Sequence, residues 1–333
     1  MVVAVPYRNY GHFIIGLLVF VSGMCLLAWM RRKPAMKNPY EKDFIGKHKC
    51  SFRPATSIRY DPADDLSNRI PQTIIQTYKP SSIEKLPESM KKAMNSFKIL
   101  NPNYTHKYFG DDAALNILIE HFGNDSDEVF AFRNLIPGAF KIDFWRYAML
   151  WLFGGFYADA DMLLMEPFEK WISPNASFVI PLEKIGFGFH NGFIGSVPQH
   201  PIMRIAMDMV IYNVKHKFYP GVPTVLKGQF RVLAVSGPVL LGKAINRYLN
   251  EPDEVVHNLP LMKEKRIQVI GFCATSSKEE DIYYTDQASS STTGSCQGNI
   301  VARVKYPEFM QENEEVTKSK HYDLLFQAKK VFA

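Results

Sequence analysis

The sequence predicts an α/β domain built on a largely parallel sheet, behind one apolar segment long enough to cross a membrane. Stretches typical of buried strands alternate with helical stretches from Arg69 onward, and this alternation is typical of α/β folds. Residues 11–30 contain no Asp, Glu, Lys or Arg, and about 20 apolar residues span the bilayer core. We therefore expect a cytosolic tail over 1–10, a transmembrane signal-anchor over 11–30, a stem over 31–68 and one folded domain over 69–333.

The net charge lies in the N-terminal part of the chain. The first 50 residues hold eight Lys and Arg but only Glu41 and Asp43, so they account for the whole net charge of +6. The balanced remainder argues against a nucleic-acid-binding surface on the main domain. A cleaved signal peptide is the alternative for residues 11–30. The apolar run of a signal peptide is usually only about 7–15 residues long, however, and no small-residue cleavage site follows residues 11–30 cleanly.

The residues alone leave the membrane topology open. Positive charge is heavier after the apolar segment than before it, which favours a cytosolic main domain. Three Asn-x-Ser/Thr sequons, at Asn103, Asn124 and Asn175, favour a lumenal domain, although such triplets often arise by chance.

Four cysteines add one further possibility. Cys25 lies in the apolar segment, and no Cys/His spacing resembles a zinc site. A disulfide between Cys273 and Cys296 is possible in an oxidising lumen, which leaves Cys50 free or paired between chains.

The first elements of the domain follow local signals. RIPQTIIQTYKP, residues 69–80, combines β-branched residues with flanking prolines and predicts a short buried strand. SIEKLPESMKKAMNSFKILNPNY predicts a helix that stops at Asn101-Pro102. YTHKYFGDD predicts a second strand, and DAALNILIEHF predicts a helix begun by an Asp cap. SSSTTGS, residues 289–295, predicts a mobile loop.

An apolar helix follows, with two charges on one face. Residues 140–153 are expected to form a helix that is buried on most sides and stopped by Gly154-Gly155. Asp143 and Arg146 are three residues apart, so they project from one face. An unpaired charge here would be costly, so the two form an internal ion pair or reach a polar cleft.

Asp159 and Asp161 form a DxD triplet after a predicted strand that ends at Ala158. If the backbone stays extended, both carboxylates point to the same side. Open α/β sheets bind ligands at this end of their strands, and carboxylates beside a diphosphate suit Mn²⁺ or Mg²⁺. A Ca²⁺-binding EF-hand is excluded because its sixth and twelfth positions would be Leu164 and Lys170.

A second triplet, DSD at residues 125–127, has the same spacing and serves as an internal comparison. It lies in FGNDSDEVF, a short polar connection with no strand leading into it. The surroundings therefore distinguish the two triplets, and only DAD is expected to carry chemistry.

Several stretches resemble glycosyltransferases with a DXD-containing sugar-binding region. RIPQTIIQTYKP is similar to that family's IPKIIHQTWK, and NPNYTHKYFGDDAA to its NP-x-Y and acidic turn. KIDFWRYAMLWLFGGFYADAD is similar to RADxxRYxxLYxxGGxYxDxD. NGFIGSVPQHPIM, SGPVLL and KHYDLLF match an Asn-led segment ending in HP, a TGP motif and a terminal HYxxLW. The family includes fungal Golgi initiating α-1,6-mannosyltransferases, inositolphosphoceramide mannosyltransferases and α-1,4-glycosyltransferases.

The resemblance implies a GT-A fold, a Rossmann-like nucleotide-sugar-binding domain, in a type II Golgi membrane protein. It implies a lumenal domain despite the charge count, since long domains translocate regardless of flanking charge. It further implies a retaining transfer to a glycan or glycolipid acceptor, so no general base is required. Glu183 and Asp208 are possible bases if the enzyme inverts.

The resemblance also implies roles for the charged residues. Asp161 would bind the Mn²⁺ or Mg²⁺ that bridges the donor phosphates. Asp159 would contact the ribose or donor sugar and reach the metal through water. Asp143 and Arg146 would hold the hydroxyls of the transferred sugar.

Four further positions match the family less specifically. Tyr78 stands where the family has Trp and would stack on the base, or it is an ordinary core or surface aromatic. Asn191 would hydrogen-bond the sugar or acceptor, or it is a turn residue before Gly192. Gly237 belongs to the TGP-like motif that binds the nucleotide-sugar. His321 would be a third metal ligand, although a lone His is more often structural.

The donor is expected to be GDP-mannose. UDP-galactose or UDP-N-acetylglucosamine is the alternative, because nothing in these residues separates guanine from uracil. A membrane-anchored but inactive carbohydrate-binding protein is the alternative from another class. The intact acidic cluster argues against it.

Overall fold

The computed structural model describes residues 69–183, 187–222, 226, 228–274, 282–288, 297–313 and 322–333. The expected tail, membrane segment and stem, residues 1–68, lie outside these ranges, as does the predicted loop at 289–295. Within the ranges described, no helix has the length and apolar character needed to cross a membrane.

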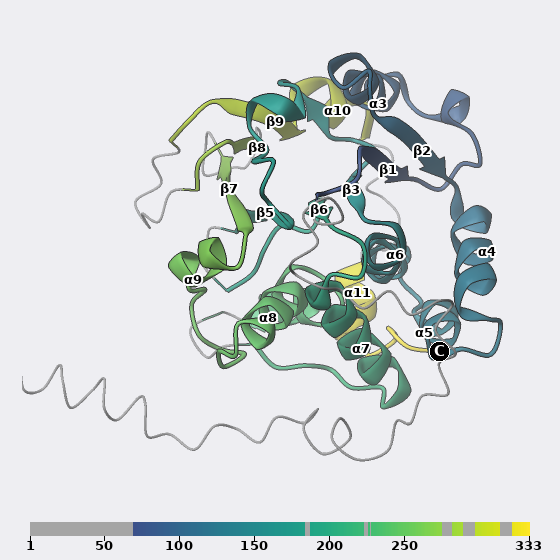
Figure 1. Ribbon diagram of the computed structural model, residues 1–333. Coiled ribbons are helices and arrows are strands. Elements are labelled where there is room, and N and C mark those ends of the chain that lie inside the picture. Colours follow the sequence, from purple (N-terminus) through teal and green to yellow (C-terminus); the bar gives the residue numbers. More distant parts are fainter. Residues whose placement is uncertain are drawn as a thin grey trace, which may run out of the picture. The chain divides into compact units, whose positions relative to one another are not determined.

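The described residues form a nine-stranded sheet (Figure 1). The strand order is β2-β1-β3-β6-β5-β7-β8-β9-β4. The strands are β1 (Thr73–Thr77), β2 (Thr105–Phe109), β3 (Gly155–Ala158), β4 (Leu163–Leu164), β5 (Phe178–Leu182), β6 (Phe193–Ser196), β7 (Ile267–Ala274), β8 (Ile282–Thr285) and β9 (Ile300–Lys305).

The sheet is mixed, so the prediction of a largely parallel sheet is wrong. β1 runs parallel to both β2 and β3, and β5 runs parallel to β7. β6 is antiparallel to both of its neighbours, β3 and β5, and the pairs from β7 to β4 are antiparallel. Strands alternate with helices as far as β3, and helices also lie between β6 and β7. In contrast, β5 to β6 and β7 to β8 are joined without a described helix, and short connections produce antiparallel pairs.

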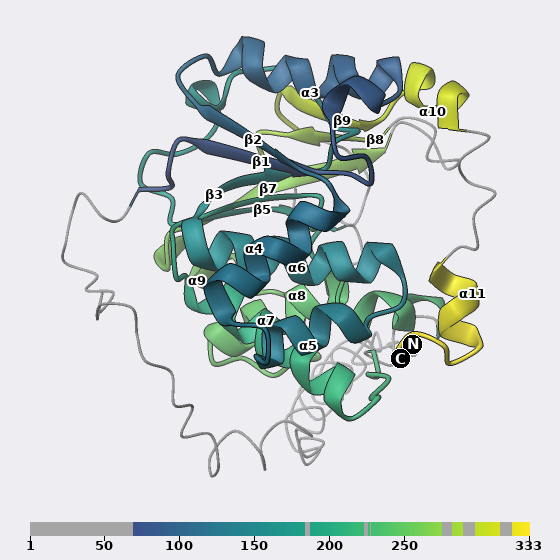
Figure 2. The same cartoon turned by 90° about the vertical axis from the view of Figure 1, so that its right-hand side faces the viewer.

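Helices cover both faces of the sheet, as the edge view in Figure 2 shows. α3 (Glu88–Leu100) and α10 (Pro307–Asn313) lie on one face. The opposite face carries α4 (Asp111–Phe122), α5 (Asp127–Asn134), α6 (Gly138–Phe153), α7 (Pro201–Lys215) and α8 (Pro238–Tyr248). The remaining helices are α9 (Leu259–Glu264) and α11 (Tyr322–Gln327), with short 3₁₀ segments η1 (Ile83–Lys85), η2 (Phe168–Lys170) and η3 (Gly228–Ala234).

The early elements agree with the local signals in the sequence. β1 is a short buried strand, α3 ends before Asn101-Pro102, and β2 and α4 lie where they are predicted. The Asp cap on α4 is wrong. The N-cap is Gly110, without a side-chain hydrogen bond, and Asp111 and Asp112 occupy the first turn. There their charges favour the positive end of the helix dipole instead.

α6 is buried along most of its length, as its composition predicts. Phe140 and every residue from Asp143 to Leu150 are buried, because the helix lies between the sheet and α7 (Figures 1 and 2). This position carries Asp143 and Arg146 into the interior.

Two glycines reverse the chain between α6 and β3. Gly154 and Gly155 have φ angles of 62° and 96°, a region that residues with a side chain rarely adopt. A Cβ on Gly155 would lie 2.6 Å from the carbonyl oxygen of Thr73 on β1. The glycines therefore permit both the reversal and the close pairing of β3 with β1, which confirms them as the stop of the helix.

Candidate active site

The DAD triplet begins directly after β3. β3 ends at Ala158 as predicted, and the backbone N–H of Asp159 donates to the carbonyl of Gly192 at 2.8 Å. The chain then turns, because Met162 N–H donates to the carbonyl of Asp159 at 3.1 Å. The backbone from Asp159 to Asp161 is therefore not extended, although an extended backbone was the condition for both carboxylates to point to the same side. Asp161 lies in the turn, and Asp159 alone continues the strand.

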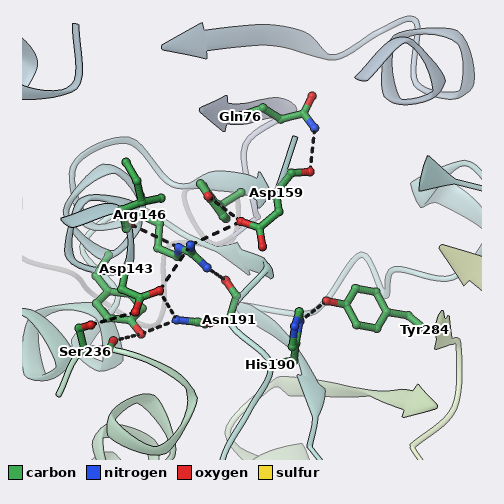
Figure 3. Close-up of polar contacts among 11 residues, drawn as sticks. Gln76, Asp143, Arg146, Asp159, His190, Asn191, Ser236 and Tyr284 are labelled. Atoms are coloured by element: carbon green, nitrogen blue, oxygen red, sulfur yellow. Dashed lines mark hydrogen bonds and ion pairs between the residues drawn. The ribbon is translucent and has the colours of Figure 1, made fainter. Parts of the chain in front are cut away.

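Arg146 joins the α6 charge pair to the triplet (Figure 3). Its Nη2 lies 3.4 Å from Asp143 Oδ1 and 3.4 Å from Asp159 Oδ1. Its Nη1 donates to the carbonyl of Asn191 at 2.5 Å, and its guanidinium lies 4.5 Å from the ring centre of Tyr157. The predicted Asp143–Arg146 pair is thus confirmed, and it extends to a second carboxylate.

The charge on Arg146 is well stabilised. Burial lowers the pKa of this guanidinium, but Tyr157, Asp159 and Asp143 outweigh that effect, and the net direction is upward. The side chain is only 7% exposed, against 33% for Asp159. Asp159 is therefore the more accessible partner, and Arg146 is a permanent positive charge behind it.

Asp143 is held by residues from two other segments of the chain. Asn191 Nδ2 donates to Asp143 Oδ1 at 2.9 Å, and Ser236 Oγ donates to Asp143 Oδ2 at 2.9 Å. Asn191 Nδ2 also donates to the hydroxyl of Tyr147 at 3.1 Å. Burial raises the pKa of the Asp143 carboxyl, while Arg146, Ser236 and Asn191 lower it. Both carboxylate oxygens therefore have partners within the protein.

The sequence did not single out Ser236, Tyr147 or Tyr157 as site residues. Tyr157 O–H donates to Asp159 Oδ1 at 2.8 Å. Ser236 directly precedes Gly237, whose Cβ, if it had one, would lie 3.4 Å from Asp143 Oδ2. The available signals were the SGP motif for Ser236 and the two-residue spacing of Tyr157 and Asp159 on one strand face.

Asp161 lies close to a group of tyrosines. Burial and then the charge of Asp161 raise the pKa of the half-buried Tyr78, and burial followed by the same charge raises that of the buried Tyr306. Tyr78 also packs against a small cluster that contains Ala160 and Leu86. The structure thus brings Tyr78 to the Asp161 side of the triplet.

The carboxylates of the triplet provide hard oxygen donors of the type that Mn²⁺ and Mg²⁺ bind. His321, the predicted third ligand, lies outside the described residues. Within the described ranges, no three His, Cys, Asp or Glu side chains are grouped so as to hold a metal. Two carboxylates completed by substrate phosphates and water are a donor set typical of Mg²⁺. Asp159 and Asp161 therefore fit a metal that binds together with a substrate.

The two possible general bases lie in different places. Arg204 Nε donates to Asp208 at 2.8 Å, and Arg204 Nη1 donates to Glu128 at 2.9 Å, in the contact between α7 and α5. This ion-pair cluster is separate from the residues around Asp159. The charge of Glu183, in contrast, raises the pKa of the buried Tyr284, after burial itself and Asp159.

The DSD triplet lies at the start of a helix, whereas a short polar connection was predicted there. Ser126 is the N-cap of α5 and accepts a hydrogen bond from the backbone of Val129 at 3.2 Å. Asp127 is the first residue of that helix. The two triplets have the same spacing, but DSD lies at a helix cap and DAD belongs to the charged cluster around Arg146.

Comparison with known proteins identifies the segment that carries this cluster. Residues 87–178 match a family described as the glycosyltransferase sugar-binding region containing DXD motif. The chain carries a DXD glycosyltransferase region. The DXD region contains Asp143, Arg146, Asp159 and Asp161, whereas Asn191 and Ser236 lie beyond it.

Two fungal proteins are similar to parts of the chain. Over 217 residues it is 26% identical to inositol phosphoceramide mannosyltransferase 1 of Schizosaccharomyces pombe, covering 63% of each chain. Over 118 residues it is 34% identical to initiation-specific alpha-1,6-mannosyltransferase of Candida albicans, covering 35% of this chain and 30% of that one. The similarity thus covers less than two thirds of either relative.

The chain is also similar to a solved structure, the ligand-free glycosyltransferase domain from the YGT toxin. The match covers 61% of this chain and 80% of the toxin domain. The two are 11% identical, with a TM-score of 0.41.

Gly192 leaves the space that the Asp159 carboxylate occupies. A Cβ at position 192 would lie 2.6 Å from Asp159 Oδ2 and 2.7 Å from His190 Cε1. We therefore expect Gly192→Ala to displace the carboxylate and to lower turnover of a nucleotide-sugar about 10²-fold, as a displacement of about 1 Å does. Gly138→Ala is the matched control, since a Cβ there would meet nothing within 4 Å. Equal activity of the two variants would contradict the assigned position of Asp159.

Proposed function

We propose that this chain is a metal-dependent, retaining glycosyltransferase that moves a hexose from a nucleotide-sugar to a glycan or glycolipid acceptor. The preferred donor is GDP-mannose, and the transferred sugar is mannose. The observation that carries the proposal is the position of Arg146 between Asp143 and Asp159 within the DXD region. The names of the two similar fungal proteins, both mannosyltransferases, support the choice of sugar.

We assign the domain to the GT-A type. The support is the parallel β2-β1-β3 unit with its carboxylates at the C-terminal end of β3. This is the edge at which open α/β sheets bind nucleotides. The expected boundaries, with a catalytic domain over residues 69–333, remain part of the proposal.

The fixed charges of the site would stabilise the departing nucleoside diphosphate. Negative charge develops on the leaving phosphate, and preorganised positive charge in a partly buried site lowers the energy of that transition state. Arg146 supplies such a charge. Asn191 and Ser236 hold Asp143 by hydrogen bonds, and Asp143 in turn orients the guanidinium of Arg146. Asp159 lies on the accessible side and would contact the ribose or the transferred sugar.

Asp159 and Asp161 would hold a Mn²⁺ or Mg²⁺ ion, which when bound acts as a Lewis acid on the diphosphate. Tyr78, on the Asp161 side, offers an aromatic face to the nucleotide base. Gly237 allows the backbone to approach the donor near Asp143. In a retaining transfer, the leaving phosphate takes the proton of the acceptor hydroxyl, so Glu183 would not act as a base.

Hydrolysis and transfer assays with a panel of nucleotide-sugars test this function. The full chain in detergent would be assayed with GDP-mannose, UDP-galactose and UDP-N-acetylglucosamine, each with Mn²⁺, Mg²⁺ or EDTA. We expect turnover of GDP-mannose that is lost in EDTA and restored by Mn²⁺. Preference for a UDP-sugar would change the donor, and neither binding nor turnover of any donor would overturn the function.

We further propose that the protein is a type II Golgi membrane protein anchored by residues 11–30, with its catalytic domain in the lumen. The three sequon asparagines, Asn103, Asn124 and Asn175, are all exposed and lie in turns. Cys273 is disulfide-bonded, which is typical of oxidising compartments. Its predicted partner, Cys296, lies outside the described residues.

The sequons provide a test of this topology. We expect the chain expressed in a eukaryotic host to shift to a lower apparent mass after treatment with an N-glycosidase. A triple Asn→Gln variant at the three sequons should run at that lower mass without treatment. An unshifted wild-type chain in the membrane fraction would argue for a cytosolic domain.

A further inference from the structure

Gln76 is a buried amide on β1, the middle strand of the parallel β2-β1-β3 unit. The other residues of this short strand are Ile and Thr, which are typical of a buried strand. A buried amide is costly unless it has hydrogen-bond partners. The partners of Gln76 therefore indicate why an amide lies at this position.

The side chain of Gln76 connects the two strands that flank β1. Its Nε2 donates to the backbone carbonyl of Asp159, directly after β3, at 3.3 Å (Figure 3). Its Oε1 lies 2.5 Å from Nε2 of His106 on β2. The acceptors alone give both directions. A backbone carbonyl only accepts, so the amide nitrogen faces Asp159, and the amide oxygen only accepts, so Nε2 of His106 is the donor.

The carbonyl of Asp159 lies where the chain leaves β3. The same oxygen accepts from the backbone N–H of Met162 at 3.1 Å, which closes the turn that contains Asp161. Between the two carboxylates, Ala160 packs in a buried apolar cluster. The hydrogen bond from Gln76 thus joins this turn to the strand beside it.

The turn determines where the two carboxylates of the DAD triplet lie relative to each other. Because the backbone is not extended here, the pleat of a strand does not align Asp159 with Asp161. A rotation of the peptide that follows Asp159 would move Asp161 relative to Asp159. Ligands of one ion must stay in place, and a displacement of about 1 Å is costly in an active site.

Asn246 on α8 has the same kinds of partners in another part of the chain. It is buried, and its Nδ2 donates to the carbonyls of Pro252 and Val255 at 3.1 and 3.0 Å. Its Oδ1 lies 2.8 Å from Nδ1 of His257. These partners belong to the connection between α8 and α9. Asn246 is therefore a matched control for a buried amide that stabilises the fold.

We propose that Gln76 is a positioning residue of the DAD triplet, which holds the peptide between Asp159 and Ala160, and that His106 fixes the orientation of its amide. The assignment rests on the proposed function, in which Asp159 and Asp161 hold a divalent metal together with the donor diphosphate. It explains why the middle strand of the parallel unit contains a buried amide.

Gln76→Met tests the assignment, because methionine has a similar size and cannot donate to the Asp159 carbonyl. Electron paramagnetic resonance would measure the Mn²⁺ dissociation constant of the full chain with GDP, or with UDP if a UDP-sugar is the donor. The Mn²⁺ concentration for half-maximal turnover would be measured in parallel. We expect both values to rise by roughly 10-fold to 10²-fold, the range typical of losing a group behind the metal ligands.

The control separates this role from a structural one. Asn246→Leu should lower the unfolding temperature measured in EDTA and leave both Mn²⁺ values within twofold of wild type. A purely structural role of Gln76 would give the same pattern in Gln76→Met.

Two substitutions at His106 test the contact from its other side. His106→Leu removes the donor to Gln76 Oε1, whereas His106→Gln places an amide N–H near the position of Nε2. We expect His106→Leu to weaken Mn²⁺ binding about threefold to tenfold, the effect of one hydrogen bond between neutral groups, and His106→Gln to restore most of it. If Gln76→Met does not fold, this pair decides, and equal Mn²⁺ binding of the two His106 variants would overturn the assignment.

The outcomes distinguish this assignment from the proposed function. If wild type is active and Gln76→Met binds Mn²⁺ within twofold of it, or Asn246→Leu weakens binding as much, the assignment is overturned and the function stands. If wild type neither binds GDP or UDP with Mn²⁺ nor turns over any donor, the function fails and the assignment fails with it.

Discussion

Asp161→Asn is expected to lower kcat by about 10²–10³-fold. This is the loss typical of removing from an active site one preorganised group that stabilises the charge of the transition state. The substitution keeps the size of the side chain and removes its negative charge. The charge of Asp161 raises the pKa of Tyr78 and Tyr306, after burial in each case. Both tyrosines stay protonated at pH 7 with or without that charge, so the substitution leaves their protonation state unchanged.

Initial rates with saturating donor and increasing Mn²⁺ would measure this effect. Partial recovery at high Mn²⁺ is expected if the substitution weakens metal binding. The matched control is Asp125→Asn in the DSD triplet, where the side chain is exposed and accepts a hydrogen bond only from Asn124 among the described residues. If Asp161→Asn were as active as Asp125→Asn, the role assigned to the DAD triplet would be wrong.

Arg146→Met is expected to destabilise the protein by about 3–5 kcal/mol, because removing one partner of a buried ion pair leaves an uncompensated buried charge. Asp143 would keep its hydrogen bonds from Asn191 and Ser236 but would lose its cation. Arg146→Lys should be less harmful to stability, yet one ammonium cannot replace a planar fork that reaches both carboxylates and the Asn191 carbonyl. Turnover should be lost in both variants.

The loss in Arg146→Met should depend on pH. Burial raises the pKa of the Asp143 carboxyl, and Arg146 opposes that effect, so removal of the guanidinium raises the pKa further. A carboxyl whose pKa is higher in the folded state favours folding at low pH and loses this contribution as the pH rises through that value. The deficit relative to wild type should therefore be largest near pH 7 and should shrink as the pH falls toward about 5.

Urea denaturation of wild type and variant at several pH values would measure the deficit. Arg204→Met is the matched control, because Arg204 also joins two carboxylates, Glu128 and Asp208, but is 30% exposed. Its loss should cost less stability and leave turnover unchanged. A pH-independent deficit in Arg146→Met would contradict the assigned link between Arg146 and Asp143.

Local sequence patterns predicted the elements that carry the site. The apolar run of α6, the glycine stop after it, the short strand β3 and the spacing of Asp143 and Arg146 all follow from signals within a few residues of one another. Helical periodicity and turn chemistry act over that range. For the same reason the neighbouring residues alone were enough to separate the DSD triplet from the DAD triplet.

Other features depended on contacts between distant segments. The partners of Asp143 are Asn191, 48 residues away, and Ser236, 93 residues away, and only the resemblance to a known family pointed to Asn191. The antiparallel insertion of β6 and the turn that separates Asp159 from Asp161 were also not predicted. Each results from the register and packing of strands far apart in the chain.

The sequence by itself therefore determined that an apolar helix presents an Asp-x-x-Arg pair and that two carboxylates follow a buried strand. Only the tertiary structure decided that Arg146 reaches across to Asp159, and that Asn191 and Ser236 hold Asp143. The physical reason is that helix and strand periodicity are set by neighbouring residues. The relative positions of charges on separate elements are set by how those elements pack.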